Sequence, residues 1–541
     1  MRSRLVLQIA VLILPLAAPA QAQQYVRLGS ELDDYLRLLE LRGTLSAAPL
    51  VFRSPTTLAS LGPVARDTTH PWFAHHPFSA ESRAPAGPAL NLLDPDWRMV
   101  YNSRYPGTEN DGALWAGRGA SVALSLGARL RWGPVTAVLD PTFTWAQNRD
   151  FDLAPDSGIG VNRGGLSRFA YAWAGGGIDW PERFGDQAFA RLDWGQTAIR
   201  LNLRPLTLGL STENLWWGPA VRNPVLMSNT AAGFPHLDLG TGGPVWIGIG
   251  RAEARLLWGR LAESAYFDTL TRNDGRLLSG MVLGLQPRWV KGLSLGVTRV
   301  FYQTWDSLTA ADFADIFQTI FKVGLSSPSN REGDDRRDQL LSLTARWTFP
   351  EAGFEAYVEW ARNDHNWDLR DLLIEPDHSR AYTIGFQQLL PSGSGLVRLQ
   401  GEFTTLGRPA TFQARSTPIY YTHYIVRQGY THRGQLLGAG IGPSSQSQFF
   451  AADRYDHNGR LGMFLQRVRF DDDAYYRSFA PTLYYRGHQT ELTAGVRAAR
   501  FAGPLDLSAR LSLSHQLNRH YQLDNDVTNL SLDVRASWRW R

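Results

Sequence analysis

The chain has 541 residues, no cysteine and a formal net charge of +5. The lack of cysteine excludes disulfides, thiolate catalysis and cysteine-based zinc sites, and a chain of this length can bury a core without covalent staples. The basic excess is small, because 55 Lys and Arg stand against 50 Asp and Glu. There is no basic run of five residues, so no nucleic-acid partner is expected.

The N-terminus has the pattern of an export signal. Arg2 and Arg4 precede an apolar run over residues 5 to about 18, and Ala20-Gln21-Ala22 has the small-x-small form of a signal-peptidase site. We therefore expect residues 1–22 to be a signal peptide. A signal anchor is the alternative, although the apolar core is shorter than the ~20 residues that a spanning helix needs.

The next segment, residues 23–95, lacks strand-like alternation and predicts a short helix followed by a connector. Ser30 stands at an N-cap position, acidic residues fill the first turn and Gly43 marks a stop. One apolar stripe follows the helical period, namely Leu32, Tyr35, Leu36 and Leu39. The Pro-, Ala- and Ser-rich stretch 71–95 predicts an extended connector. We expect this periplasmic helical segment to lie against or inside the mouth of a barrel.

From Trp97 onward, apolar and polar residues alternate between turn signals. Residues 122–132, 341–349 and 505–513 show the pattern, with Arg129, Thr344 and Arg510 among the polar positions. Such two-faced strands predict an all-β fold, in which residues 96–541 form a single transmembrane antiparallel β-barrel. Strands of ~10 residues plus their connections give roughly 16 to 20 strands. A soluble array of β-sandwiches is the alternative.

A long aromatic loop follows the predicted strand at residues 206–211. It contains adjacent tryptophans, Trp216 and Trp217, and then Arg222 and Asn229. Ring faces stack on the C–H surfaces of sugars, and forked donors meet hydroxyl or uronate oxygens. These four residues are therefore the candidate saccharide-binding site. The alternative is that the tryptophans belong to a membrane girdle or to the core of the loop.

Other candidate chemistry is sparse. Residues 292–296 spell G-x-S-x-G, but they lie in an alternating strand, whereas a nucleophile elbow needs a strand–turn–helix context. Acidic groups at 334–335 and 471–473 could hold calcium, but we expect them to be solvated loop tips. His75 and His76 lack a third ligand at useful spacing. We expect no metal site, no cofactor and no enzymatic activity, since no nucleophile is paired with a base.

The last stretch, residues 530–541, alternates strictly, with apolar residues at the even positions. Trp538 and Trp540 stand near its end, and tryptophan favours a membrane–water interface. This pattern predicts that the final strand closes the barrel by pairing with the first.

Three parts of the chain share a family pattern. Residues 213–219 read Glu-Asn-Leu-Trp-Trp-Gly-Pro and are followed by 226–231 and by Phe234-Pro235. Residues 357–361 with Asp364, and 429–438 with Ile441-Gly442, come later in the chain. In order and spacing these stretches resemble the Wzi family of outer-membrane capsule assembly proteins.

The resemblance implies a barrel of about 18 strands in the cell outer membrane, with a small periplasmic helical element. It implies a surface lectin that anchors capsular polysaccharide to the cell. The implied partners are outer-membrane lipid, lipopolysaccharide and capsular or extracellular polysaccharide. An outer-membrane porin or specific uptake channel is the runner-up, and it requires an open, water-filled lumen. An outer-membrane hydrolase is third.

Overall fold

The computed structural model describes residues 25–45, 50–55, 69–76, 87–107, 109–158, 160–203, 205–314, 316, 337–363, 373–409, 417, 419–479 and 487–540. The predicted signal peptide lies outside these residues. The fold is all-β and mostly antiparallel, with short helical elements in the connections.

The helical elements are α1 (Glu31–Leu41), η1 (Trp305–Ser307), η2 (Ala310–Ala314), η3 (Pro350–Ala352), α5 (Asp472–Ala474), η5 (Tyr475–Phe479) and η7 (Arg519–Tyr521). The strands are β1 (Phe52–Arg53), β2 (Ala89–Leu92), β3 (Asp96–Asn102), β4 (Gly119–Ser125), β5 (Ala128–Trp132), β6 (Val135–Leu139), β7 (Thr142–Ala146), β8 (Phe189–Asp193), β9 (Ala198–Leu203), β10 (Leu206–Ser211), β11 (Trp216–Trp217), β12 (His236–Thr241), β13 (Val245–Trp246), β14 (Gly250–Ala262), β15 (Gly275–Pro287), β16 (Leu293–Thr304), β17 (Arg337–Phe349), β18 (Phe354–Asn363), β19 (Arg380–Ser392), β20 (Gly395–Thr405), β21 (Thr431–His432), β22 (Gln435–Leu436), β23 (Gln446–Asp456), β24 (Gly459–Arg469), β25 (Thr490–Ala502), β26 (Leu505–Leu517) and β27 (Val527–Trp538).

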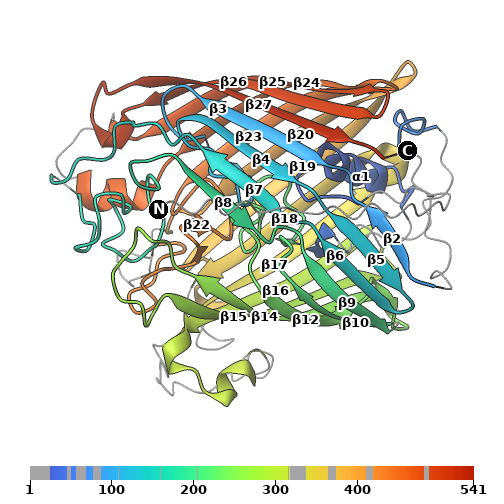
Figure 1. Ribbon diagram of the computed structural model, residues 1–541, viewed down its shortest axis with the longest axis horizontal. Coiled ribbons are helices and arrows are strands. Elements are labelled where there is room, and N and C mark those ends of the chain that lie inside the picture. Colours follow the sequence, from blue (N-terminus) through green and yellow to red (C-terminus); the bar gives the residue numbers. More distant parts are fainter. Residues whose placement is uncertain are drawn as a thin grey trace, which may run out of the picture.

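One large antiparallel sheet forms the wall of the molecule (Figure 1). From β14 to β20, and again from β23 to β27, each strand pairs with its successor, and β20 pairs with β23. The last strand, β27, pairs with β3, and this pairing places Leu532 opposite Tyr101. The order of paired strands therefore returns on itself. The prediction that the C-terminal strand pairs back to the start of the sheet is confirmed.

The two faces of the wall differ in polarity, as the alternation predicts. On β26, Leu511 and Leu513 are exposed on the outer face, whereas Ser512 and Ser514 are buried on the inner one. Arg129, on β5, is also buried inside. An apolar outer face suits lipid, and a polar inner face suits a lumen that contains polar partners. Among the described residues, no helix is both long and apolar enough to cross a membrane.

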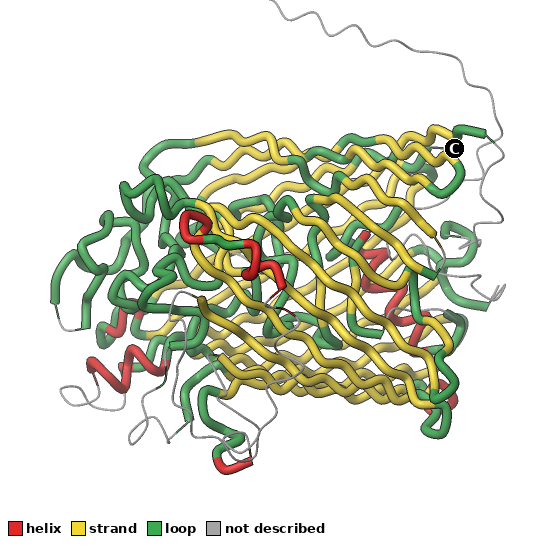
Figure 2. The backbone as a smooth tube through the Cα atoms, turned by 90° about the horizontal axis from the view of Figure 1, so that it is seen from below, coloured by secondary structure: helices red, strands yellow, loops and turns green. Residues whose placement is uncertain are grey.

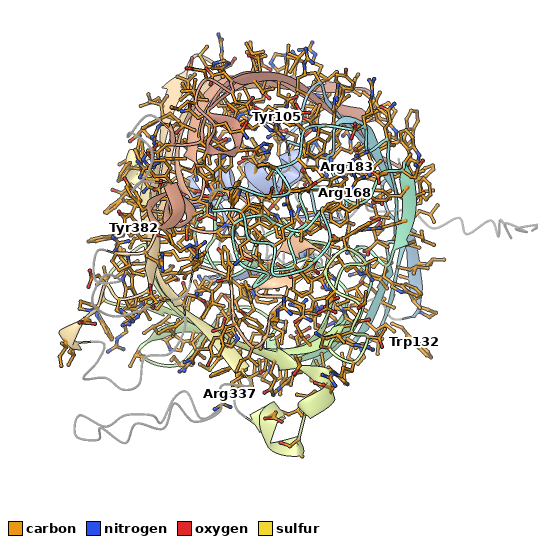
Figure 3. The ribbon with its side chains drawn as sticks, turned by 90° about the vertical axis from the view of Figure 1, so that its left-hand side faces the viewer. Tyr105, Trp132, Arg168, Arg183, Arg337 and Tyr382 are labelled. Atoms are coloured by element: carbon orange, nitrogen blue, oxygen red, sulfur yellow. The ribbon has the colours of Figure 1, made fainter. Side chains whose placement is uncertain are left out.

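The connections differ between the two ends of the wall (Figure 2). We call one end the turn end, because tight turns join β15 to β16 and β25 to β26 there; the C-terminus lies at the same end. The other end is the loop end, which carries the long connections β7–β8 and β26–β27. Seen from the loop end, chain crosses the inside of the ring, and the side chain of Trp132 points outward (Figure 3).

Helix α1 lies within the wall toward the turn end (Figure 1). As predicted, Ser30 is its N-cap and accepts a hydrogen bond from the backbone N–H of Asp33 at 3.2 Å. Tyr35, Leu36 and Leu39 of the predicted stripe are buried in one cluster, against which Leu32 packs. The same cluster includes Trp72, whose ring stacks on Tyr35 with centroids 3.9 Å apart.

Part of the predicted connector belongs to the wall. β2 pairs with β5 and places Leu90 opposite Leu130, so the sheet begins at Ala89. Residues 71–76 form turns rather than extended chain. Residues 77–86 lie outside the described part.

Candidate functional site

The loop that carries the candidate residues folds into the lumen, where wall carboxylates hold its backbone. Glu402, on β20, accepts from the backbone N–H of Val221 at 2.6 Å and of Asn223 at 2.8 Å. Glu253, on β14, accepts in the same way from Leu50 at 2.7 Å. Charge-assisted bonds of this kind are about twice as strong as neutral ones. Residues 50–55 and 212–235 are thus fixed to the wall.

Trp216 and Trp217 form a short strand inside the lumen. This strand, β11, pairs with Phe52 and Arg53 of β1. Trp216 is 6% exposed and packs in the cluster of α1, whereas Trp217 is 1% exposed and packs in a cluster with residues of the wall. A Cβ at Gly280 would lie only 2.7 Å from the Trp217 ring, so this glycine lets the ring approach β15. Both side chains are packing residues in this structure.

Arg222 faces a polar cavity of about 190 Å³ in the lumen. Its guanidinium pairs with Glu109 and lies 3.9 Å from the ring centroid of Phe449. Burial and the neighbouring guanidinium groups of Arg510 and Arg497 lower the pKa of Arg222 to about 9. The charged residues around this lumenal cavity are Glu31, Asp34, Arg98, Glu109, Arg222, Arg460, Arg497, Arg510, Asp533 and Arg535.

Asn229 lies close to this lumenal cavity, but its side chain forms hydrogen bonds with the backbone. It is 9% exposed, and its side-chain amide donates to the carbonyl of Asn110 at 3.0 Å. Asn110 itself lines the lumenal cavity and donates to the carbonyl of Arg222 at 2.8 Å. Asn229 therefore supports the rim of the cavity that Arg222 lines, while the two tryptophans point into separate apolar clusters.

Ion pairs join α1 to the inner face of the wall. Asp34 binds Arg398 of β20 through two hydrogen bonds, at 2.8 and 2.6 Å, and also accepts from Arg460 of β24 at 2.9 Å. Arg37 pairs with Glu355 of β18 at 2.8 Å. These contacts reach the wall strands β18, β20 and β24. They hold α1 in the lumen.

A second cavity, of about 240 Å³, lies among the connections of the loop end. Its aromatic lining residues are Tyr105, Trp115, Phe151, Tyr171, Trp173, Trp180, Phe470 and Tyr521. They come from the β3–β4, β7–β8, β24–β25 and β26–β27 connections. Because these connections are far apart in sequence, no short sequence motif predicts the cavity.

A family model described as capsule assembly protein Wzi matches residues 106–529. The chain belongs to this family. The Wzi match covers both cavities in part, but it leaves out α1, which precedes it. No curated protein sequence matches the chain.

Solved structures extend the comparison. Wzi of Escherichia coli, described as an outer-membrane carbohydrate-binding β-barrel involved in group 1 capsule assembly, superimposes with a TM-score of 0.58 at 12% identity, covering 93% of this chain and 97% of that one. This likeness shows a shared fold. OccAB2 of Acinetobacter baumannii gives a TM-score of 0.41 at 13% identity, covering 85% and 100% of the two chains. OpdQ of Pseudomonas aeruginosa gives a TM-score of 0.39 at 11% identity, covering 83% of this chain and 97% of that one.

The acidic run at 471–473 is not a solvated loop tip in this Wzi-family chain. Asp471, Asp472 and Asp473 are 1%, 3% and 4% exposed. Asp471 caps α5 and accepts from the hydroxyl of Tyr171 at 2.7 Å, while Asp472 accepts from Gln446 at 2.6 Å. The expectation of solvation was wrong because each carboxylate has partners within the fold. Within the described ranges, no three His, Cys, Asp or Glu residues gather as metal ligands.

Proposed function

We propose that this Wzi-family protein anchors capsular or extracellular polysaccharide to the outer surface of the cell. It is an outer-membrane protein of capsule assembly, and residues 1–22 are its export signal. Two findings support the proposal: the family match over residues 106–529, and the fold shared with a barrel described as carbohydrate-binding. The loop end binds the polymer and does not catalyse a reaction on it.

We further propose a transmembrane barrel of 18 strands. The pairs β2–β3, β4–β5, β6–β7 and β8–β9 each count as one interrupted strand, since both halves of each pair face the same neighbour. Together with β10, β12, β14–β20 and β23–β27 they give this number. The exposed outer leucines of these strands would contact lipid and the acyl chains of lipopolysaccharide.

The filled lumen favours an anchor over a channel. A porin requires a continuous aqueous path. Here α1 and residues 212–235, together called the plug, occupy the lumen and bind the wall through ion pairs and carboxylates. An anchor needs no such path. A direct saccharide role for Trp216, Trp217, Arg222 and Asn229 stays a prediction, and the packing of the two tryptophans supports a bracing role for them.

The test of the anchoring function is a gene deletion in the source bacterium. We expect total polysaccharide to be unchanged and the cell-bound fraction to fall, with the released polymer found in the medium. Re-expression of the full chain should restore the bound fraction. Unchanged retention, together with reduced uptake of small solutes, would instead support the channel.

Conductance in planar bilayers tests the plug separately. The wild-type barrel should show no large steady conductance, and a variant lacking residues 25–76 should conduct more, because α1 and Trp72 are removed while residues 212–235 and β2 remain. Heat-modifiable gel mobility must show that the variant inserts as a folded barrel. Equal conductance of the two proteins would contradict a plug.

A further inference from the structure

The loop-end cavity has the wall chemistry of a sugar site. Tyr171 and Trp180 meet at a ring-centroid distance of 4.9 Å and an angle of 48°, and Trp173 meets Tyr521 edge-on at 5.2 Å. The rings thus meet tilted or edge-to-face rather than face-to-face. Trp180 also lies against Gly442, where a Cβ would come within 2.6 Å of its ring. This close approach fixes the orientation of a partly exposed indole at the edge of the cavity.

Polar groups stand among these rings. Glu491, on β25, accepts from the hydroxyl of Tyr105 at 2.8 Å, and Figure 3 shows Tyr105 at the loop end, inside the ring of strands. Arg519 lies 5.0 Å from the Tyr105 ring centroid and donates to the carbonyl of Asp152 at 3.0 Å. Glu182 accepts from a backbone N–H at 2.9 Å. Carboxylates have about four acceptor positions, so both glutamates retain capacity for hydroxyl donors.

One buried donor in the lining has no partner. Trp115 is 8% exposed, and its indole N–H makes no hydrogen bond to any described residue. A buried N–H left unpaired costs about 1–3 kcal/mol. An acceptor supplied by a ligand or a water molecule would remove that cost. The aromatic lining rings all belong to connections of the loop end, so the cavity is assembled where a polymer outside the cell could reach it.

The charges of the lining select against an anionic ligand. The charged side chains are the carboxylates Glu182 and Glu491 and the guanidinium Arg519. Burial and the charge of Arg519 lower the pKa of His520 to about 3, so this imidazole is neutral at physiological pH. Arg163 pairs with Glu182 at 3.4 Å and offsets its charge, so the site offers no excess of positive charge to a carboxylate ligand. The lumenal cavity around Arg222 is different, since arginines outnumber acids there.

The backbone beside the cavity is strained. Asn518, His520 and Tyr521 have φ values of 51°, 58° and 59°, in the left-handed region that residues other than glycine seldom adopt. Each such backbone conformation costs of order 1–3 kcal/mol of folding free energy. It persists where the surrounding structure holds it, often at ligand sites. Here they aim the His520 and Tyr521 side chains at the cavity that both residues line.

We propose that the loop-end cavity binds a single neutral sugar residue, a hexose or deoxyhexose, of the polysaccharide. The inference rests on the proposed anchoring function and names its binding site. The volume of about 240 Å³ is below the ~300 Å³ at which drug-sized pockets begin, so it suits one ring and not an oligosaccharide. The indole of Trp180 stacks on the C–H face of the sugar, Glu182 and Glu491 accept its hydroxyl protons, and Trp115 donates to one of its oxygens.

The test uses the full-length refolded protein in detergent. Tryptophan fluorescence is titrated with D-glucose, D-galactose, D-mannose, L-rhamnose, L-fucose and D-glucuronate, and a second arm measures binding of the surface polysaccharide isolated from the source bacterium. The variants are Trp180→Ala and Glu491→Gln. Their matched controls are Trp289→Ala and Glu351→Gln, at exposed positions in the β15–β16 and β17–β18 turns.

At least one neutral sugar should bind, with D-glucuronate at least about 10-fold weaker, and Trp180→Ala should weaken binding about 10-fold, which corresponds to the ~1.4 kcal/mol of one stacking face. Glu491→Gln should weaken it about 3-fold or more, and both controls should bind as wild type. If Trp180→Ala fails to fold, Glu491→Gln alone tests the proposal, because this substitution leaves the side-chain volume nearly unchanged. The proposal is overturned if no neutral sugar binds, if D-glucuronate binds best, or if the folded variants bind as wild type.

The polymer arm separates this inference from the proposed function. Polymer that binds wild type and both variants equally overturns the cavity assignment and leaves the anchoring function intact. Neutral monosaccharide binding without any polymer binding overturns the anchoring function and leaves the cavity a sugar site.

Discussion

The lumenal plug and the loop-end cavity use opposite chemistries. In the plug, charged groups are paired: Arg398 is fully buried and binds both Asp34 and Asp453. In the cavity, charges are few, aromatic rings dominate and the indole N–H of Trp115 lacks a partner. A paired network stabilises a single arrangement of the chain, whereas an unpaired donor in the lining of a cavity is suited to a ligand. The indole N–H of Trp217 is unpaired too, but that ring packs among wall residues. We infer that the plug serves stability and the cavity serves recognition.

The largest expected effect comes from the two tryptophans of the plug. Replacing both Trp216 and Trp217 with alanine should destabilise the protein by about 3–5 kcal/mol for each ring, because both are buried in apolar clusters. Folding yield and the temperature at which the barrel unfolds on gels should fall. Polysaccharide affinity of the fraction that still folds should change less than 3-fold. Lost affinity with unchanged stability would reverse the roles assigned to plug and cavity.

Buried charge is the next test of the plug. Arg398→Ala leaves Asp34 and Asp453 without their shared partner, and breaking such a buried pair costs about 3–5 kcal/mol. Chemical denaturation in detergent measures the loss. The control is Arg168→Ala at the loop end (Figure 3), where the Arg168–Asp186 pair is about half exposed and should contribute less than about 1 kcal/mol. Similar losses at the two sites would contradict the distinction between a buried network and a surface pair.

The same division explains what the sequence could predict. The wall repeats one rule, apolar out and polar in, and so the strands at 122–132 and 505–513 and the final strand follow from period-two alternation alone. Helix α1 follows from its cap and stripe. The residues 212–235 that fill the lumen follow no regular period of apolar and polar residues. Trp216 and Trp217 look the same in sequence whether they stack on sugar or on protein, and only the pairing of β11 with β1 places them inside.

The loop-end cavity was beyond sequence reasoning for a different reason. Trp115, Trp180 and Tyr521 are separated by long stretches of chain and meet only because the wall brings their connections to one end. The acidic run 471–473 illustrates the same point, since its burial depends on partners such as Tyr171 that lie some 300 residues earlier. Composition shows that such residues exist, but their proximity depends on the closed order of the strands.

The plug should also respond to acid. Burial alone raises the pKa of Asp34, but the guanidinium groups of Arg398 and Arg460 outweigh it and hold that pKa well below its usual range. A depressed pKa gives stability that is present above the unfolded-state value, about 3.9, and is lost as the pH falls below it. Asp34→Asn should therefore cost about 1.5–3 kcal/mol at pH 7, and the difference from wild type should shrink below about pH 4. Denaturation at pH 7, 5 and 3 measures this, and a pH-independent difference would show that the charge of Asp34 does not hold the plug.

The smallest effects come from removing one hydroxyl group in each region. The Tyr35 hydroxyl, in the plug, accepts from the buried backbone N–H of Trp72 at 3.2 Å, so Tyr35→Phe leaves that donor unpaired and should cost about 1–3 kcal/mol. The Tyr105 hydroxyl, in the cavity, donates to Glu491. Thr493 also donates to that carboxylate, at 3.4 Å. Because water in the cavity can replace the lost donor, Tyr105→Phe should cost no more than about 1 kcal/mol.

The two Tyr→Phe variants are compared by denaturation and by sugar titration on the same preparations. Tyr35→Phe should lower stability and leave sugar affinity unchanged. Tyr105→Phe should leave stability nearly unchanged and alter affinity by a few fold, since Glu491 then relies on the sugar or on water for a donor at that position. If the order of the two stability losses is reversed, the hydrogen bonds of the cavity are structural ones, and the aromatic pocket belongs to the same paired network as the plug.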